Sequence, residues 1–326
     1  MSETIENIGE EELLKRLRKF MAIGQIDDDT ADITPSTNKL IINTDLLVDE
    51  VHFSDLTTSA EDVGWKAIAS NVSDLVASGS HNIMSFTVGL VVPPQTSWTW
   101  VEGLYQGITK ALNYFGGNLV GGDCSKGKQK MLSITAIGGI NEIRLHRSNA
   151  VPGDYLVTSG SHGLSRLGLA ILTTDPYLKH TKLSDNLIKK ALKAHQRPMP
   201  PLKALKTLIA SKPKDCSWRA SGTDSSDGLL NAVQNICKSS GCEAILRKKD
   251  MPKDIDWPTG KVWNNWCLNG GEDYEFIISL PKTWAEEFIK RDKNAKIIGL
   301  IKSGKPQIKW DDNELININS GVFKHF

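Results

Sequence analysis

The sequence predicts a mixed α/β protein of two domains, and three observations support this. The chain has 326 residues, more than a single domain of ordinary size needs. Strand-like and helix-like patterns alternate in both halves, as is typical of α/β folds. Residues 150–154 read Ala-Val-Pro-Gly-Asp, which is a turn signal between the halves. We therefore predict an N-terminal domain over residues 1–149 and a C-terminal α/β domain over residues 150–326.

The first half begins with a short amphipathic helix, because apolar residues recur at helical spacing between Leu13 and Phe20. Residues 40–48 are mostly apolar and partly β-branched, which predicts a buried strand with polar residues at one end. A long helix is expected over residues 63–76, and Gly79 is its predicted stop.

Residues 85–92 and 131–140 read as further strands of the first half. The helical face over residues 101–115 lies between them and ends at the pair Gly116-Gly117. The second half continues in the same style. Its expected strands are 155–159, 275–280 and 297–301, and its expected helices are 186–194 and 229–237.

Composition excludes several classes of protein. Hydrophobic residues make up 40% and charged residues 24%, which supports a sizeable core. Lys and Arg number 39 against 38 Asp and Glu, so the net charge of +1 predicts no nucleic-acid or anionic membrane partner. No apolar run approaches the length of a membrane span.

Location is predicted from the N-terminus and the cysteines. The first twelve residues are acidic and contain no apolar segment, so no signal peptide is expected. The five cysteines include no CxxC pair, which disfavours a disulfide framework and a structural zinc site. We therefore expect a cytoplasmic protein.

Several acidic residues stand at positions where an ionised carboxylate is costly unless it has a partner. Four crowd into six residues, one ends a predicted strand, and one lies inside an apolar helix. Two precede a predicted helix, and the others follow a pair of glycines. They are Asp27, Asp28, Asp29, Asp32, Asp45, Asp74, Asp123, Asp224, Asp227, Glu272 and Asp273. Gathered carboxylates repel one another and need cations to stay ionised. Because carboxylates are hard oxygen ligands, a hard ion such as Mg²⁺, Ca²⁺ or Mn²⁺ is favoured over zinc.

Each of these features also has a plainer interpretation. Residues 27–29, taken alone, are more typical of a solvated acidic turn, and residues 121–123 could form an ordinary tight turn. Asp227 or Ser226 is suited to capping the helix that follows. His52, taken alone, is more typical of a structural histidine than of a ligand.

The common nucleotide-binding and hydrolase motifs are missing from the sequence. It contains no GxxxxGK[ST] loop, no protein-kinase HRD and DFG pair, no convincing GxGxxG after a strand, and neither GxSxG nor HExxH. A nucleotide would therefore have to bind to another scaffold.

Ten short motifs occur in a specific order along nearly the whole chain. They are Asp28-Asp29, Asn43-Thr44-Asp45-Leu46-Leu47-Val48, Val51-His52-Phe53, Gly64-Trp65-Lys66-Ala67, Asn71-Val72-Ser73-Asp74-Leu75, Gly121-Gly122-Asp123, Arg197-Pro198, Asp224-Ser225-Ser226-Asp227-Gly228-Leu229, Gly270-Gly271-Glu272-Asp273-Tyr274-Glu275 and Lys324-His325-Phe326. Each motif is weak alone, but the ordered set resembles the thiamine-monophosphate kinase family of the aminoimidazole-ribonucleotide-synthetase-like superfamily.

The resemblance implies a fold and a reaction. The sheet of the N-terminal domain would pair across a homodimer, with ATP bound near the shared barrel and the C-terminal α/β domain completing the cleft. The reaction would be ATP- and Mg²⁺-dependent direct in-line phosphoryl transfer to thiamine monophosphate, giving thiamine diphosphate and ADP. Several Mg²⁺ ions would assist, and no protein residue is expected to act as a covalent or basic catalyst.

The resemblance also implies roles for individual residues. The metal positions are Asp29, Asn43, Thr44, Asp45, Asp74, Asp123, Asp224 and Asp227. The ATP positions are Gly122, Asp123, Arg147 and Ser226, and the substrate positions are His52, Glu272 and Phe323. Three residues depart from the family pattern: Asp27 stands where Gly is usual, Asn43 where a small hydroxyl residue is common, and Cys124 where Thr is common.

Two alternatives stay open at this point. One is another ATP-dependent synthetase of the same superfamily, although residues 1–22 hold no Cys for selenide chemistry. The other is a non-catalytic module that binds a nucleotide or a metal, although such a paralogue is expected to lose acids and this chain keeps them.

Overall fold

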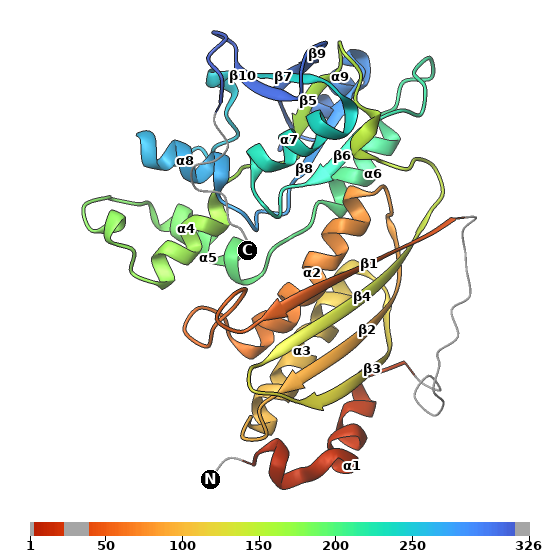
Figure 1. Ribbon diagram of the computed structural model, residues 1–326, viewed down its shortest axis with the longest axis vertical. Coiled ribbons are helices and arrows are strands. Elements are labelled where there is room, and N and C mark those ends of the chain that lie inside the picture. The colour runs from red at the N-terminus through yellow and green to blue at the C-terminus, as the bar shows by residue number, and fades with distance from the viewer. Residues whose placement is uncertain (1–2, 23–38, 317–326) are drawn as a thin grey trace. The chain divides into compact units, whose positions relative to one another are not determined.

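The computed structural model describes residues 3–22 and 39–316, and Figure 1 shows its helices and strands. It divides into two compact units. The first contains the described residues up to Leu75 together with Ser80–Asn141, and the second contains Val76–Gly79 with the described residues from Glu142 onward. Both units combine helices with a sheet, so the predicted mixed α/β class is confirmed.

The predicted boundary at residues 149 and 150 falls inside the second unit of this division. The reason lies in the short 3-10 helix η2 (Arg147–Asn149), which is bonded to the second unit. The Asn149 side chain donates to the Ala220 carbonyl at 3.2 Å, and the Arg147 carbonyl accepts from the Ser221 hydroxyl at 3.1 Å.

The first unit is built on a four-stranded sheet in the order β1-β4-β2-β3. Its strands are β1 (Lys39–Val48), β2 (Asn82–Val92), β3 (Asn118–Lys126) and β4 (Met131–Ile140). The β2–β3 pair is parallel, and the pairs that β4 makes with β1 and β2 are antiparallel. The strand predicted over residues 131–140 is confirmed at both ends.

Two long helices, α2 (Ala60–Ala77) and α3 (Trp98–Phe115), cover one face of this sheet (Figure 1). Alternate residues of β2 and β4, such as Val88 and Ile134, are buried beneath them. The two helices approach closely, since a Cβ at Gly107 would overlap the Glu61 carbonyl oxygen. Both helices were predicted, and both are followed by glycines with positive φ, at Gly79 and Gly116.

The other face of the sheet carries exposed apolar side chains in the described part of the chain. On β1, Ile42 is 68% exposed and Leu46 is 52% exposed. The prediction of a buried strand over residues 40–48 is therefore wrong in one respect. The side chains of Leu40, Ile42 and Leu46 all project from the face of β1 that α2 does not cover, and within residues 3–22 and 39–316 they stay exposed.

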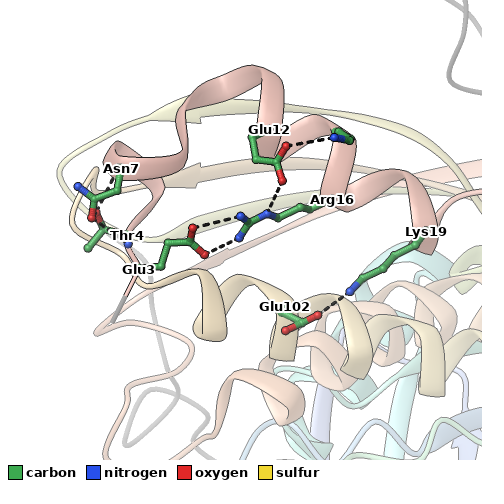
Figure 2. A network of polar contacts seen from close by, with 8 residues as sticks. Glu3, Thr4, Asn7, Glu12, Arg16, Lys19 and Glu102 are labelled. Atoms are coloured by element: carbon green, nitrogen blue, oxygen red, sulfur yellow. Dashed lines mark hydrogen bonds and ion pairs between the residues drawn. The ribbon is translucent and has the colours of Figure 1, made fainter. Parts of the chain in front are cut away.

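Helix α1 (Ile5–Leu17) and the turn after it carry the polar network in Figure 2, which reaches α3 through Lys19. Arg16 forms ion pairs with Glu3 and Glu12, and Lys19, in the 3-10 helix η1 (Arg18–Phe20), pairs with Glu102 of α3.

The second unit contains a six-stranded sheet in the order β10-β7-β9-β5-β8-β6. Its strands are β5 (Tyr155–Thr158), β6 (Ser221–Asp224), β7 (Glu243–Leu246), β8 (Phe276–Leu280), β9 (Lys296–Lys302) and β10 (Gln307–Trp310). Neighbouring strands are antiparallel apart from the parallel β10–β7 pair.

The helices described in the second unit are α4 (Leu164–Leu172), α5 (Asp185–Gln196), α6 (Leu202–Ala210), α7 (Leu229–Ser240), α8 (Lys261–Asn269) and α9 (Lys282–Arg291), with the 3-10 helices η3 (Pro176–Leu178) and η4 (Lys248–Asp250). Some of them contribute to two apolar clusters. Helix α7 packs on the sheet through residues such as Val233 and Ile236. Leu167 of α4, Leu187 of α5 and Trp266 of α8 share the second cluster.

Helix α2 belongs to both units. Its last two residues, Val76 and Ala77, are grouped with the second unit, as are Ser78 and Gly79. The Ser78 carbonyl accepts the backbone N–H of Leu145 at 3.1 Å and Nη1 of Arg144 at 2.9 Å.

The structure also bears on the expectations about membrane spans and cysteines. None of the helices in residues 3–22 and 39–316 is both long and apolar enough to cross a bilayer. The five cysteines are free thiols, and burial raises the pKa of the Cys267 thiol to about 12, which keeps it protonated and unreactive.

Replacing Gly107 by Ala should separate α2 from α3, because the new Cβ meets backbone rather than a movable side chain. We expect the free energy of unfolding to fall by about 2 kcal/mol. Gly103→Ala in the same helix is the matched control, since its nearest neighbour would be the Ala60 Cβ at 3.3 Å. Equal denaturation midpoints for the two variants would contradict this packing.

Candidate active site

Strand β1 and helix α2 bring predicted metal positions together. The Nδ2 of Asn43 donates to Asn71 Oδ1 and to Asp74 Oδ2, both at 3.0 Å. Since Asn71 Nδ2 donates to the Ala67 carbonyl at 2.9 Å, the Asn71 oxygen is left as the acceptor. Asp45 lies two residues after Asn43 on β1 and therefore projects from the same face of the sheet.

The amide oxygen of Asn43 is suited to bind a cation. This Oδ1 atom is buried and has no hydrogen-bond partner, which is costly for a polar atom away from water. The Nδ2 atom of the same amide donates to the Asp74 carboxylate. Amide and carboxylate oxygens are the ligands that Mg²⁺ prefers, so this donor set fits the ion that the sequence predicts. The departure at Asn43 therefore keeps an oxygen donor.

Thr44 and Asp123 lie on the opposite, open face of the same sheet. Thr44 Oγ1 is 2.9 Å from Thr135 Oγ1, across the β1–β4 pair. Asp123 pairs in register with Gly89, and its neighbour Cys124 faces the helices, where it is hydrogen-bonded to Tyr105. Because β1 and β3 are the two edge strands, Thr44 and Asp123 are also separated by the width of the sheet.

The Gly121-Gly122-Asp123 motif lies within strand β3, so its interpretation as a tight turn is wrong. Packing requires glycine at position 122, because a Cβ there would overlap the Val88 carbonyl oxygen of β2. The sequence does not predict that Gly122 lies opposite Val88, because the register of β2 and β3 shifts at an irregularity between Phe86 and Thr87.

His52 is held in one orientation by the loop after β1. Its Nδ1 accepts the backbone N–H of Val48 at 3.0 Å, which assigns the proton of a neutral ring to Nε2. The His52 carbonyl accepts from Nζ of Lys66 at 3.3 Å, and Lys66 is only 1% exposed. Lys66 belongs to a motif of the resemblance, but its contact with His52 was not predicted.

In the second unit, the predicted residues gather where β6 ends. Ser226 Oγ donates to Asp224 Oδ1 at 3.0 Å. Asp227 Oδ2 accepts from Asn231 Nδ2 at 3.3 Å, one turn into α7. Arg147 Nε donates to the Thr223 hydroxyl at 3.0 Å, beside Asp224 on the same strand.

The helix-capping alternative for Ser226 and Asp227 is wrong. The N-cap of α7 is Gly228, and no side chain makes a capping hydrogen bond there. Their side chains instead bond Asp224 and Asn231.

The loop that carries Glu272 lies against this group. Its backbone N–H donates to the Ser226 carbonyl at 2.7 Å, and the Glu275 N–H donates to Ser225 Oγ at 3.0 Å. Gly271 permits the approach, because a Cβ there would crowd the Ser226 carbonyl oxygen. The structure thus joins one predicted substrate position to the predicted metal and nucleotide positions Asp224, Ser226 and Asp227.

Two acids of this loop, Asp273 and Glu275, were not predicted to have a role. Asp273 accepts the N–H groups of Gly163 at 2.6 Å and Ser165 at 3.0 Å, at the start of α4. Glu275 is hydrogen-bonded to the Ser159 hydroxyl. Burial nevertheless raises the pKa of Asp273 to about 7 and the pKa of Glu275 to about 8.

The predicted acids occur here as smaller groups. Within residues 3–22 and 39–316, no three His, Cys, Asp or Glu side chains lie close enough together to hold a metal ion. The first group joins Asp74 to an amide, and the second joins Asp224 to a hydroxyl. The predicted positions Asp29 and Phe323, and the departure at Asp27, lie outside the described residues.

Comparison with known proteins first defines the class. Residues 27–140 match the family model described as AIR synthase related protein, N-terminal domain. The solved structure "AaThiL complexed with AMPPCP and TMP" superposes with a TM-score of 0.76 at 27% identity, covering 98% of each chain.

The particular family follows from two relatives. The chain is 53% identical to the thiamine-monophosphate kinase of Prochlorococcus marinus, covering 99% of this chain and 98% of the relative. It is 35% identical to the thiamine-monophosphate kinase of Synechococcus elongatus, covering 99% and 98%. The chain therefore belongs to the thiamine-monophosphate kinase family, and the predicted resemblance is confirmed.

The raised pKa values of Asp273 and Glu275 predict how stability depends on pH. Between the ordinary carboxyl pKa of about 4 and the folded values of about 7 and about 8, the folded state binds more protons than the unfolded state. The free energy of unfolding should therefore fall as pH rises through this window.

Glu275→Gln should weaken this dependence, because Gln carries no titrating proton. Thermal melts of the wild type and the variant between about pH 5 and about pH 9 measure it. Glu287→Gln on α9 is the control, since the pKa of that exposed carboxyl is lowered. A decline of equal steepness in the wild type and Glu275→Gln would show that Glu275 is ionised in the folded state.

Proposed function

We propose that this chain transfers the terminal phosphoryl group of ATP to the phosphate of thiamine monophosphate, giving thiamine diphosphate and ADP. One observation carries the proposal. The bond between the Glu272 N–H and the Ser226 carbonyl joins the loop assigned to thiamine phosphate to the loop assigned to the nucleotide. Phosphoryl transfer depends on holding donor and acceptor in a fixed relation.

The relatives support the same assignment. Both curated relatives are named thiamine-monophosphate kinase, and the superposed AaThiL structure is described as a complex with AMPPCP and TMP. A phosphotransferase acting on a phosphate acceptor is thus the class that the family defines.

The acceptor phosphate would supply its own nucleophile. A phosphate monoester has its second pKa near about 6, so its oxygens are largely ionised at neutral pH and need no strong general base. The remaining difficulty is repulsion between two anions. In this proposal the Arg147 guanidinium binds nucleotide phosphates, and His52, protonated at Nε2, donates to thiamine monophosphate.

Divalent cations fit this chemistry. When bound, Mg²⁺ would supply positive charge to the phosphates and lower the cost of bringing them together. The buried Oδ1 of Asn43, which has no hydrogen-bond partner, supports such a site, and Nδ2 of the same amide donates to Asp74. The proposed ligands are Asp29, Asn43, Thr44, Asp45, Asp74, Asp123, Asp224 and Asp227. Since Asp123 and Asp45 occupy opposite edges and faces of one sheet, several ions are a better account than one.

The direct experiment is incubation of the protein with ATP, Mg²⁺ and thiamine monophosphate, followed by chromatography. Formation of thiamine diphosphate in equal amount to ADP is the expected result. Hydrolysis of ATP without thiamine diphosphate would overturn the proposal, and so would a complete lack of turnover at saturating substrates.

Asp74→Asn should lower turnover on the order of 100-fold or more, because it removes a charge that would balance the cation at the phosphates. The fold should survive, since Asn43 can still bond the new amide oxygen. Asp185→Asn, at an exposed position in the first turn of α5, is the control. Near-normal turnover of Asp74→Asn at saturating Mg²⁺, with an unchanged melting curve, would remove Asp74 from the site.

We also propose that two copies associate through the open face of the first sheet. This face carries Leu40, Ile42 and Leu46 of β1, which are 42%, 68% and 52% exposed. Exposed apolar residues concentrated on one strand are typical of an interaction surface. Pairing of the sheets in a dimer would cover them.

Ile42→Lys should shift the protein from dimer to monomer, because a charge would be buried in the proposed contact. Ile255→Lys is the matched control, because Ile255 is 92% exposed on a loop of the second unit. Sedimentation equilibrium of both variants and the wild type measures the effect. A monomeric wild type, or an Ile42→Lys variant that stays dimeric, would refute this interface.

A further inference from the structure

The last turn of α5 places a buried histidine against Glu272. His195 is 3% exposed, and its Nδ1 is 3.4 Å from Glu272 Oε2. The hydroxyl of Ser165, in the first turn of α4, is 3.2 Å from the same ring nitrogen. The Glu272 side chain is 29% exposed, so its carboxylate meets both the histidine and the solvent side of the loop.

The carboxylate selects one protonation state of this ring nitrogen. If Nδ1 carried a lone pair, the Ser165 hydroxyl would be suited to donate to it, but that lone pair would then face the lone pairs of Glu272 Oε2, 3.4 Å away. If Nδ1 carries a hydrogen, it can donate toward Glu272, and the Ser165 oxygen can accept from the same group. The geometry therefore favours Nδ1–H.

The surrounding backbone holds both partners in place. A Cβ at Gly168 would overlap the Ala191 carbonyl oxygen and crowd the His195 Cβ, so α4 and α5 are in close contact at this level. Asp273, the neighbour of Glu272, binds the first N–H groups of α4, including that of Ser165. Glu272 itself has a φ of 63°, a left-handed conformation that a non-glycine residue adopts at a cost.

We propose that His195 is a positioning residue for substrate recognition: it donates Nδ1–H toward the Glu272 carboxylate and so directs that carboxylate to the cationic heteroaromatic part of thiamine monophosphate. This rests on the proposed function, in which Glu272 contacts that substrate. His195 does not touch the substrate or the phosphates. Its loss should therefore weaken binding of thiamine monophosphate while leaving the ATP side of the reaction unchanged.

The kinetic test compares His195→Leu with His195→Asn. Leucine has no donor, whereas the asparagine amide can place an N–H near the position of Nδ1. We expect the KM for thiamine monophosphate to rise on the order of 10-fold in His195→Leu, with kcat and the KM for ATP nearly unchanged. His195→Asn should restore most of the loss. His180→Leu, at an exposed position, is the control.

A double-mutant cycle separates positioning from a merely structural role. In the Glu272→Gln background, His195→Leu should add little, because the carboxylate that it directs is already gone. Full additivity of the two changes would overturn the proposal. So would a loss of kcat and of both KM values together in His195→Leu. If His195→Leu does not fold, Ser165→Ala and His195→Asn complete the same cycle.

A spectroscopic measurement decides the pairing without any turnover. The ¹⁵N chemical shifts of the His195 ring should report a protonated Nδ1 in the wild type and a changed tautomer population in Glu272→Gln. An unprotonated Nδ1 in the wild type would refute the proposal. A wild type that shows the expected shifts but forms no thiamine diphosphate would instead refute the proposed function and leave the His195–Glu272 pair established.

Discussion

A carboxylate taken out of water must find donors or cations nearby, and each of the two units meets this requirement by itself. Asp74 receives the amide of Asn43, and Asp224 receives the hydroxyl of Ser226. Asp273 receives amides at the start of α4, and its pKa still rises to about 7. Backbone donors therefore offset only part of the cost of burying this carboxylate.

The alternation of side chains along β1 divides residues that are adjacent in sequence. Asn43 and Asp45 project toward α2, whereas Thr44 meets Thr135 on the open face. A short motif that reads as one cluster in the chain is therefore distributed over two sides of a sheet. Helix α2 has the opposite effect, since it returns Asp74 to the side chain of Asn43, which is distant in sequence.

Strongly periodic segments were predictable from the sequence, and contacts between distant segments were not. Helices α2 and α3 and strand β4 follow from apolar spacing and from glycines at their ends. The edge position of β1 depends on which strands neighbour it, which periodicity does not encode. His195 escaped prediction because its partner Glu272 lies far along the chain, although it stands two residues before the Arg197-Pro198 motif.

The continuity of α2 across both units limits how this protein can be dissected. The four residues from Val76 to Gly79 complete the second unit, where the Ser78 carbonyl accepts from Leu145 and Arg144. A fragment that starts at Glu142 would lack these residues and leave those donors without their acceptor. A single cleavage cannot release both units intact. Gene fusions, truncations and circular permutations of this chain must therefore keep α2 and the residues after it uninterrupted.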